Sequence, residues 1–491
     1  MRAPEFPEDT SWLNTDYPLS LSMLRGHVVV LDFWTYCCIN CLHVLPDLAW
    51  LEEKYQAEPV LVIGVHSAKF DNEKNINNIK SAIQRYGVDH PVVIDQEQRI
   101  WQLYTIKAWP SFVVIGPDGR ISNMMSGEGK REALDECIKQ ALDEGRRKGM
   151  LAEKRIGMMR PSYAESLLSF PGKLAYDSDH DRLFVSDSNH HRIVELELTG
   201  EYQARVTRVI GSGIAGKEDG GFAEASFYRP QGMAYHAEKL YICDTDNHLI
   251  REVDLREERV YTIAGTGEQG WYGETGGFAL ATRLNSPWDV VLDGKHLYIA
   301  MAGSHQLWRL DVSTGIIDVF AGSGRENIWD DTAHKAHLAQ PSGIATDKKQ
   351  LYFADSEASA LRKASLTDGY VHTLIGSGLF AFGMQDGSFS IAELQHPLGV
   401  TYHEGKVYVA DTYNHAIRIA HLNEKCMETL VWGSAKGVCT IEEEACDLLP
   451  LNEPNDVLVI KNRLYIADTN NHLIRIVDLD TKRLTVLDIE Q

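Results

Sequence analysis

Two cysteines one helical turn apart, Cys38 and Cys41, carry the clearest chemical signal in the chain. They follow an apolar, strand-like run at residues 28–31 and open a segment with a helical pattern. Free N–H groups at a helix N-terminus favour the thiolate form of Cys38. Cys41 is then placed to attack a mixed disulfide on Cys38 and to release the bound partner. The spacing therefore predicts dithiol–disulfide chemistry.

The residues around this pair resemble the thioredoxin fold, whose members read D-F-W-x-x-x-C-x-x-C. Here the pattern starts at Asp32, and residues 1–150 alternate strand and helix patterns after an irregular lead-in over residues 1–27, as an α/β domain does. The resemblance implies that Asp32 is a buried acid that helps to move the proton of Cys41.

A second match to this fold lies at Trp109 and Pro110, which precede an apolar strand pattern. The resemblance implies a cis bond before Pro110, with the preceding backbone beside Cys38 to pair with a substrate chain. An additional helix and strand before Pro110 resemble the bacterial disulfide-reductase branch of the fold and the peroxiredoxins.

Three residues depart from the thioredoxin pattern. Cys37 stands where Trp is usual, Asn40 where Pro is usual, and Trp109 where Thr or Val is usual. Cys37 is either a third thiol for exchange or a filler for the missing Trp. A metal site built from these cysteines lacks a second Cys-x-x-Cys, so we expect neither a metal nor a cofactor.

From residue 166 the chain consists of six copies of one repeat. The copies start at Asp187, Asp244, Met301, Asp355, Asp411 and Asp468, at spacings of 57, 57, 54, 56 and 57 residues. Each copy contains four short strand patterns, and most contain Asn-His-x-Ile-Arg or a variant of it. Four strands repeated six times predict a six-bladed β-propeller, and the motif resembles the NHL repeat.

The predicted fold is thus multidomain, α/β followed by all-β. A thioredoxin-like domain at 1–150 and a linker at 151–165 precede a six-bladed NHL β-propeller at 166–491. The combination resembles the family of NHL-repeat-containing protein 2, in the form of its bacterial two-domain relatives.

The polar residues of the repeat invite a catalytic interpretation, but their recurrence at one offset indicates that they connect neighbouring strands. This applies to the histidines His191, His248, His305, His415 and His472. The residues after each strand-initial proline should ring the channel: Gly172, Gln231, Trp288, Ser342, Leu398 and Asn455. We expect a water-filled channel there, with a bound ion or ligand beside Asp289 and Asp456 as the alternative.

Composition limits the partners. The 491 residues have a formal net charge of −22, which argues against nucleic acid or an anionic membrane surface. We expect no secretory signal in residues 1–9 and no membrane span, because no apolar run reaches about 18 residues. The expected location is cytoplasmic, and Cys439 and Cys446 are expected to be free thiols.

Three functions remain open. The first is a cytosolic thiol–disulfide oxidoreductase in which the propeller binds a protein substrate or partner. The second is a non-catalytic protein-interaction scaffold that uses the cleft expected between the thioredoxin-like domain and the propeller. The third is a thiol peroxidase, since Thr35-x-x-Cys38 matches part of the peroxiredoxin motif, although Leu31 replaces its proline. The oligomeric state is left open.

Overall fold

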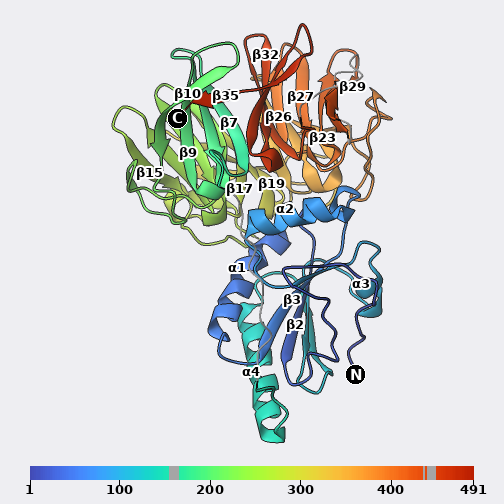
Figure 1. The fold of residues 1–491 in the computed structure, drawn as a ribbon. Coiled ribbons are helices and arrows are strands. Elements are labelled where there is room, and N and C mark those ends of the chain that lie inside the picture. The colour runs from blue at the N-terminus through green and yellow to red at the C-terminus, as the bar shows by residue number, and fades with distance from the viewer. Residues whose placement is uncertain (154–164, 272, 435–436, 440–448, 491) are drawn as a thin grey trace. The chain divides into compact units, whose positions relative to one another are not determined.

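The computed structural model describes residues 1–153, 165–271, 273–434, 437–439 and 449–490. The chain divides into two compact units, Met1–Glu165 and Ser166–Gln491, and each is described by itself (Figure 1). Most of the expected linker and Cys446 lie outside the described residues, as does the side chain of Cys439. The two units correspond to an α/β fold and an all-β fold.

The first unit is built on one mixed sheet of six strands in the order β1-β4-β3-β2-β5-β6. The strands are β1 Trp12–Leu13, β2 Val28–Trp34, β3 Val60–His66, β4 Val92–Ile94, β5 Ser111–Ile115 and β6 Ile121–Ser126. The helices are α1 Ile39–Lys54, α2 Ile76–Tyr86, α3 Arg99–Leu103 and α4 Arg131–Lys148. Strands β2, β3 and β4 run parallel, whereas β1, β5 and β6 are antiparallel to their neighbours. This is the thioredoxin-like architecture that the sequence predicts.

The lead-in contains a strand that the sequence analysis did not predict. Trp12 pairs with Val93 and extends the sheet beyond β4. A two-residue strand has too few residues for alternation to be recognised.

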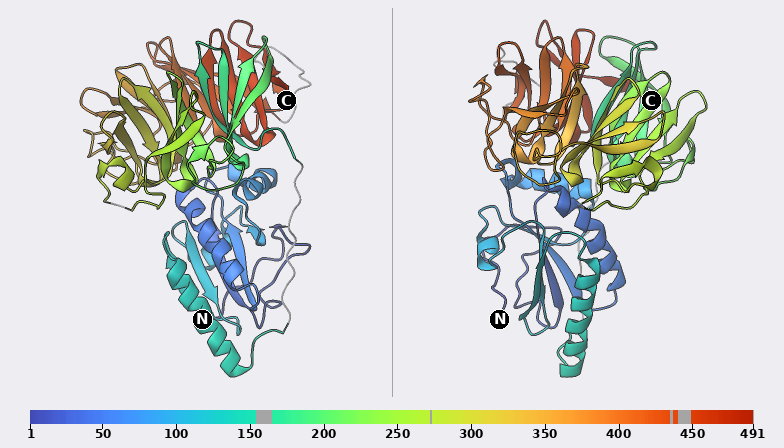
Figure 2. Two further views of the ribbon diagram at one scale, coloured as in Figure 1. Left: turned by 90° about the vertical axis from the view of Figure 1, so that its left-hand side faces the viewer. Right: turned by 180° about the vertical axis from the view of Figure 1, so that it is seen from behind.

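Alternation along β2 separates two different faces of the sheet. Val29, Leu31 and Phe33 enter an apolar cluster with the lead-in and α3. Asp32 and Trp34 point to the opposite face, which α1 and α4 cover (Figure 2). This second face also carries Val28 and Val30, and it directs Asp32 at the helix that carries the cysteines.

The second unit is a six-bladed β-propeller. Blade 1 comprises β7 Pro171–Asp177, β8 Arg182–Asp187, β9 Arg192–Leu198 and β10 Gln203–Ile210. Blade 2 comprises β12 Pro230–His236, β13 Lys239–Asp244, β14 Leu249–Asp254 and β15 Arg259–Ala264. Blade 3 comprises β17 Pro287–Asp293, β18 His296–Met301, β19 Gln306–Asp311 and β20 Ile316–Ala321.

The remaining blades follow the same antiparallel meander. Blade 4 comprises β21 Pro341–Thr346, β22 Gln350–Asp355, β23 Ala360–Ser365 and β24 Val371–Ile375. Blade 5 comprises β26 Gly399–His403, β27 Lys406–Asp411, β28 Ala416–His421 and β29 Cys426–Ser434. Blade 6 comprises β31 Pro454–Ile460, β32 Arg463–Asp468, β33 Leu473–Asp478 and β34 Leu484–Val486.

Short strands extend four of these sheets, and one of these strands, at the C-terminal end, closes the ring of blades. Strands β11 Gly220–Gly221, β16 Gly276–Phe278 and β25 Gly387–Ser388 pair with the outer strands of blades 2, 3 and 5, and β30 Gly437–Cys439 also joins blade 5. The C-terminal strand β35 Asp488–Glu490 pairs in parallel with β10 of blade 1. The six inner strands contact one another in ring order, and β31 returns to β7.

The repeated histidines connect neighbouring blades, as the sequence analysis predicts. Each sits at a left-handed position, and its Nδ1 atom accepts a hydrogen bond from a backbone N–H that precedes the next blade. The five donors are the amides of Arg229, Ser286, Gln340, Glu453 and Phe170. In blade 4, Ser359 replaces the histidine, and its hydroxyl accepts a hydrogen bond from the backbone amide of His396 at 3.1 Å. The weaker copies of the repeat therefore keep this connection.

The aspartate that starts a repeat pairs with an arginine seven residues later in four blades. In blade 5, Arg418 donates to Asp411 at 2.7 Å and to Asp386 at 2.6 Å, and its side chain is fully buried. Blade 3 has Met301 and Trp308 at these two positions, so an apolar pair takes the place of the ion pair.

Candidate functional site

The cysteine pair lies at the corner between β2 and α1. Cys38 is the N-cap residue of α1 with an extended backbone (φ −83°, ψ 115°), and its carbonyl accepts from the amides of Cys41 and Leu42. Cys38 is partly exposed, whereas Cys37 and Cys41 are buried. Cys38 and Cys41 are free thiols. The geometry thus presents one thiol to solvent and keeps the second directly behind it.

Cys41 is held in its protonated form by its surroundings. Burial raises the pKa of the Cys41 thiol well above its ordinary value, and the hydrogen bond with Cys38 and the charges of Cys38 and Asp32 add to this effect. A thiol in this state needs a base before it can act as a nucleophile. The structure places a carboxylate beside it.

That carboxylate belongs to Asp32, on the face of β2 that points to α1. The side chain is fully buried, and neither oxygen has a hydrogen-bond partner among the described residues. Burial raises the pKa of Asp32 to about 7, and the charge of His90 acts in the opposite direction. A carboxyl group with this pKa gains and loses a proton near neutrality, as a general base for Cys41 must.

The cis-proline loop lies beside the same corner. The bond between Trp109 and Pro110 is cis, and Ser111 at the start of β5 pairs with Phe33 near the end of β2. Continuing this antiparallel register by one residue places Pro110 opposite Trp34, which shortly precedes the cysteines in the chain. Its carbonyl accepts from the amide of Gly127 at 2.9 Å.

Trp109 is partly buried and packs on Trp101, with ring centroids 4.4 Å apart. The bulky residue that departs from the thioredoxin pattern is thus supported by a second indole from α3. It forms part of the surface next to Pro110, and its backbone is the segment that the sequence analysis expected to pair with a substrate chain.

Glu73, which the sequence analysis did not single out, anchors the loop that carries Cys37. This buried residue belongs to the short 3-10 helix η1 Asn72–Lys74. One carboxylate oxygen accepts from the Thr35 hydroxyl at 2.6 Å and from the Cys37 amide at 3.0 Å. The other accepts from the amides of Lys69 and Phe70. Four donors on one carboxylate hold the loop before Cys38 in one conformation.

Cys37 is buried in this loop. Its sulfur lies 3.8 Å from the Thr35 hydroxyl. The Tyr36 ring, its neighbour, stacks on His66 at 5.5 Å between centroids. Burial lowers the pKa of His66 to about 3, so this imidazole is neutral and acts as an aromatic support.

The axis of the propeller contains a charged group that the sequence analysis missed. Lys173 on β7 is buried and reaches across to Asp289 on β17 (3.1 Å), to the Leu398 carbonyl (2.7 Å) and to Asp456 on β31 (3.5 Å). A lysine side chain therefore crosses the axis of the expected channel at this level. The two aspartates are ligands of that ammonium group.

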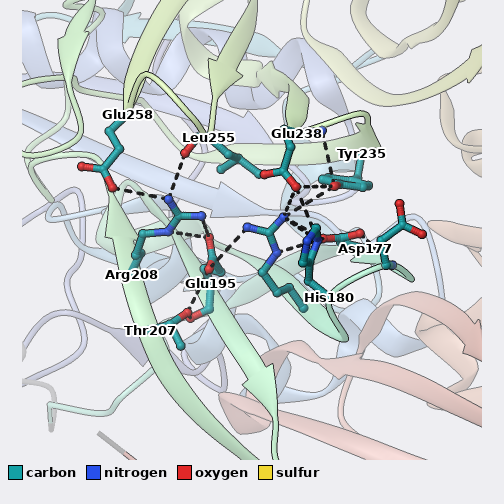
Figure 3. Close-up of polar contacts among 11 residues, drawn as sticks. Asp177, His180, Glu195, Thr207, Arg208, Tyr235, Glu238, Leu255 and Glu258 are labelled. Atoms are coloured by element: carbon teal, nitrogen blue, oxygen red, sulfur yellow. Dashed lines mark hydrogen bonds and ion pairs between the residues drawn. The ribbon is translucent and has the colours of Figure 1, made fainter.

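A second charged cluster lies between blades 1 and 2 (Figure 3). Asp177, His180 and Glu238 place ligand atoms within 4.8 Å of one another. Arg182 already donates to Asp177 at 2.6 Å and to Glu238 at 2.8 Å, so a guanidinium supplies the positive charge. Arg208 continues the cluster by donating to Glu195 and to the Leu255 carbonyl. The cluster clamps two blades together.

The six residues predicted for the redox site fall into one connected region. Cys41 is hydrogen-bonded to Cys38 and lies in the electric field of Asp32, and Cys37 precedes the pair in the anchored loop. Trp109 and Pro110 come alongside through the β2–β5 register. His90 and Glu73 were missed because each comes from a polar stretch without a motif.

Comparison with known proteins agrees with the folds of both units. A family profile described as Thioredoxin-like matches residues 26–121, and one described as NHL repeat matches residues 168–196 and 394–420. The chain is 41% identical over 526 residues to human NHL repeat-containing protein 2, with 100% of this chain aligned to 72% of that protein. The chain belongs to the NHL repeat-containing protein 2 family.

Other relatives extend the comparison. This member of the NHL repeat-containing protein 2 family is 44% identical over 498 residues to the Arabidopsis thaliana protein named SUPPRESSOR OF QUENCHING 1, chloroplastic. That alignment covers 97% of this chain but 46% of the plant protein, so the chain spans about half of that relative. It is also 29% identical over 122 residues to the thiol-disulfide oxidoreductase ResA of Bacillus anthracis, covering 25% of this chain and 68% of ResA. Within the described residues, no helix has the length and apolar character needed to cross a membrane.

Proposed function

We propose that this chain is a cytosolic thiol–disulfide oxidoreductase that acts on protein disulfides through Cys38 and Cys41. The single observation that carries the proposal is the partly exposed N-cap thiol of Cys38 with the buried Cys41 thiol hydrogen-bonded behind it and Asp32 alongside. The plant relative's name refers to the chloroplast, which is said of that protein alone.

In the proposed reaction, the Cys38 thiolate attacks one sulfur of a substrate disulfide and displaces the other sulfur as a thiolate. Cys41 then gives its proton to Asp32 and attacks the sulfur of Cys38. The mixed disulfide breaks, the substrate leaves as a second thiolate, and the Cys38–Cys41 disulfide remains. The substrate is reduced by two electrons and the protein dithiol is oxidised by two; the opposite direction uses the same steps.

Trp109, Pro110 and Cys37 are assigned positioning roles. The backbone before Pro110 pairs with an extended substrate segment, and Trp109 offers an aromatic surface beside it. Cys37 is proposed to fill space in the anchored loop, since its sulfur is buried and faces the Thr35 hydroxyl. The propeller is proposed to bind the protein substrate or partner, without nucleic acid.

The peroxidase alternative loses support at Thr35. The Thr35 hydroxyl of the partial motif is engaged, since it donates to Glu73 at 2.6 Å, and Leu31 replaces the proline of the motif. We therefore keep disulfide exchange as the proposal.

The test is a redox titration of the full chain against glutathione, with alkylation of free thiols and mass spectrometry. We expect a reversible Cys38–Cys41 disulfide with a potential between roughly −270 and −120 mV. Cys38→Ser should abolish turnover of disulfide substrates, whereas Cys137→Ser, outside the site, should leave it unchanged. The opposite outcome is that no Cys38–Cys41 disulfide forms at any redox potential set with glutathione, while a Cys38/Cys41 double serine variant still captures partners. That outcome would identify a scaffold instead.

A further inference from the structure

His90 connects the buried Asp32 to the protein surface. It precedes β4, and its side chain is 3% exposed. Its Nδ1 atom lies 3.3 Å from a carboxylate oxygen of Glu52 on α1, whose side chain is 20% exposed. Because a carboxylate only accepts hydrogen bonds, Nδ1 carries the hydrogen in the neutral ring, and Nε2 is left as an acceptor.

Nε2 of His90 lies beside Gly64, the residue of β3 that pairs with Asp32. Asp32 on β2 pairs in register with Gly64 on β3, so the two residues share one face of the sheet. A methyl group on Gly64 would lie 3.3 Å from Nε2 of His90 and 2.9 Å from Nε1 of Trp34. Because glycine has no side chain, the imidazole of His90 can approach β2 and β3 where Asp32 and Gly64 pair. Nε2 has no hydrogen-bond partner among the described residues.

The backbone around His90 is held in place from two sides. The side-chain amide of Asn14 donates to the carbonyls of Val88 (2.7 Å) and His90 (3.1 Å). The amide of Gly64 donates to the carbonyl of Pro91 at 2.9 Å. An imidazole held this way keeps Nε2 beside Gly64, the register partner of Asp32, and Nδ1 toward Glu52.

We propose that His90 and Glu52 form the route by which the proton taken up by Asp32 reaches solvent. The inference rests on the proposed oxidoreductase function and names two further residues of its resolving step. Asp32 takes the proton of Cys41 and passes it through an intervening water to Nε2 of His90, while Nδ1 releases its own proton to Glu52, which gives it to water. No electrons move on this route. His90 is left with its hydrogen on Nε2, and the reverse transfer, when Cys41 regains a proton on re-reduction of the disulfide, restores the hydrogen to Nδ1.

The titratable groups that face the route come from three elements: Asp32 from β2, Cys41 and Glu52 from α1, and His66 from β3. Burial keeps the imidazole of His66 neutral, with a pKa of about 3, so it does not compete for the proton near neutrality. The lead-in contributes the uncharged amide of Asn14.

The experiment follows the reduced full chain mixed with a chromogenic aryl disulfide in a stopped-flow instrument. Attack by Cys38 releases one coloured thiolate, and resolution by Cys41 releases the second. We expect His90→Gln to slow the second release about tenfold near neutral pH while leaving the first release unchanged. The midpoint of its pH profile should move upward, because the charge of His90 lowers the pKa of Asp32.

Glu52→Gln and Glu53→Gln form a matched pair on α1, since both remove one negative charge but Glu53 is exposed. Glu52→Gln should slow the second release about threefold, and Glu53→Gln should have no effect. Gly64→Ala, which keeps every titratable group, should reproduce the defect of His90→Gln by displacing the imidazole.

Two results would overturn the inference: a second release in His90→Gln with the rate and pH midpoint of the unmodified chain, or equal effects of Glu52→Gln and Glu53→Gln. A variant that fails to fold exposes its buried thiols and changes both releases together, and Glu52→Gln then decides. If the unmodified chain shows no second release at all, the proposed oxidoreductase function itself fails, which is a distinguishable outcome.

Discussion

At the scale of single residues, the redox site depends on burying acidic groups without the partners they usually have. Asp32 and Cys41 are both fully buried, and the charge of Asp32 disfavours the thiolate form of Cys41. This arrangement is poor for stability but suits a thiol that must stay protonated until substrate is bound. The chemistry and the stability of the fold are therefore linked through the same carboxyl group.

The pKa of Asp32 leads to a prediction about stability. In the unfolded chain the group ionises with a pKa near 3.8, but in the folded chain only at about 7. The folded state therefore loses stability as pH rises from about 4 to about 7, by about 4 kcal/mol as an order of magnitude. Asp32→Asn should stabilise the first unit by about 2–4 kcal/mol at about pH 8, and by little at about pH 4.

Hydrogen exchange of the β2 and β3 amides, measured at both pH values, checks this expectation. Asp16→Asn, at an exposed position of the lead-in, is the matched control and should change nothing. A gain in Asp32→Asn that is the same at both pH values would show that the ionisation of Asp32 is not its cause.

At the scale of elements, the parts of the fold that could be predicted were those with a pattern. The apolar run before Cys38 predicts β2, and the periodic repeat predicts the blades and the role of His248 and its equivalents. Glu73 and His90 contribute to the site from segments whose local sequence has no such pattern. Their roles depend on long-range contacts that only the folded chain reveals.

Lys173 shows a related limit. A repeat predicts what the blades share, whereas this lysine occurs in one blade and bonds to three others. The prediction of a water-filled channel followed from the shared positions, and it did not include the unshared lysine side chain that crosses the axis.

The blade motif itself leads to a prediction in blade 5. Arg418→Met leaves Asp411 buried without its cation, and we expect a loss of about 3–5 kcal/mol from the propeller. Adding Asp411→Asn should recover part of this loss, since blade 3 is built without either charge. Arg309→Met, which breaks an exposed pair with Asp318, should change stability by about 0–1 kcal/mol. Calorimetry of the full chain distinguishes these outcomes; equal effects of the two arginine variants would contradict the assignment.

At the scale of the whole molecule, the propeller must close a ring of six blades whose ends are far apart in sequence. Three devices meet at the junction of the first and last blades. Strand β35 pairs with β10, the Phe170 amide donates to His472 at 3.0 Å, and the Thr469 hydroxyl donates to the Pro171 carbonyl at 2.8 Å. Lys173 adds a fourth connection along the axis, because it links blade 1 to blades 3, 5 and 6.

The axial lysine leads to a prediction with a definite pH dependence. Burial raises the pKa of Asp456 to about 7 and also raises that of Asp289, while the charge of Lys173 lowers both. Lys173→Met removes that charge, so the carboxylates become more costly where they are ionised. We expect the propeller to lose about 3–5 kcal/mol at about pH 8 and less at about pH 5, where protonated carboxyl groups need no cation.

Thermal unfolding of the full chain at these two pH values, followed by calorimetry, measures the difference. Neutralising both acids in the Lys173→Met background, with Asp289→Asn and Asp456→Asn, should restore most of the stability at the higher pH. Lys461→Met, at an exposed lysine that pairs with Asp181, is the matched control and should change little. If Lys173→Met instead lost the same stability at both pH values, its contribution would be one of packing along the axis, and the ion pairs would not be what holds the ring together.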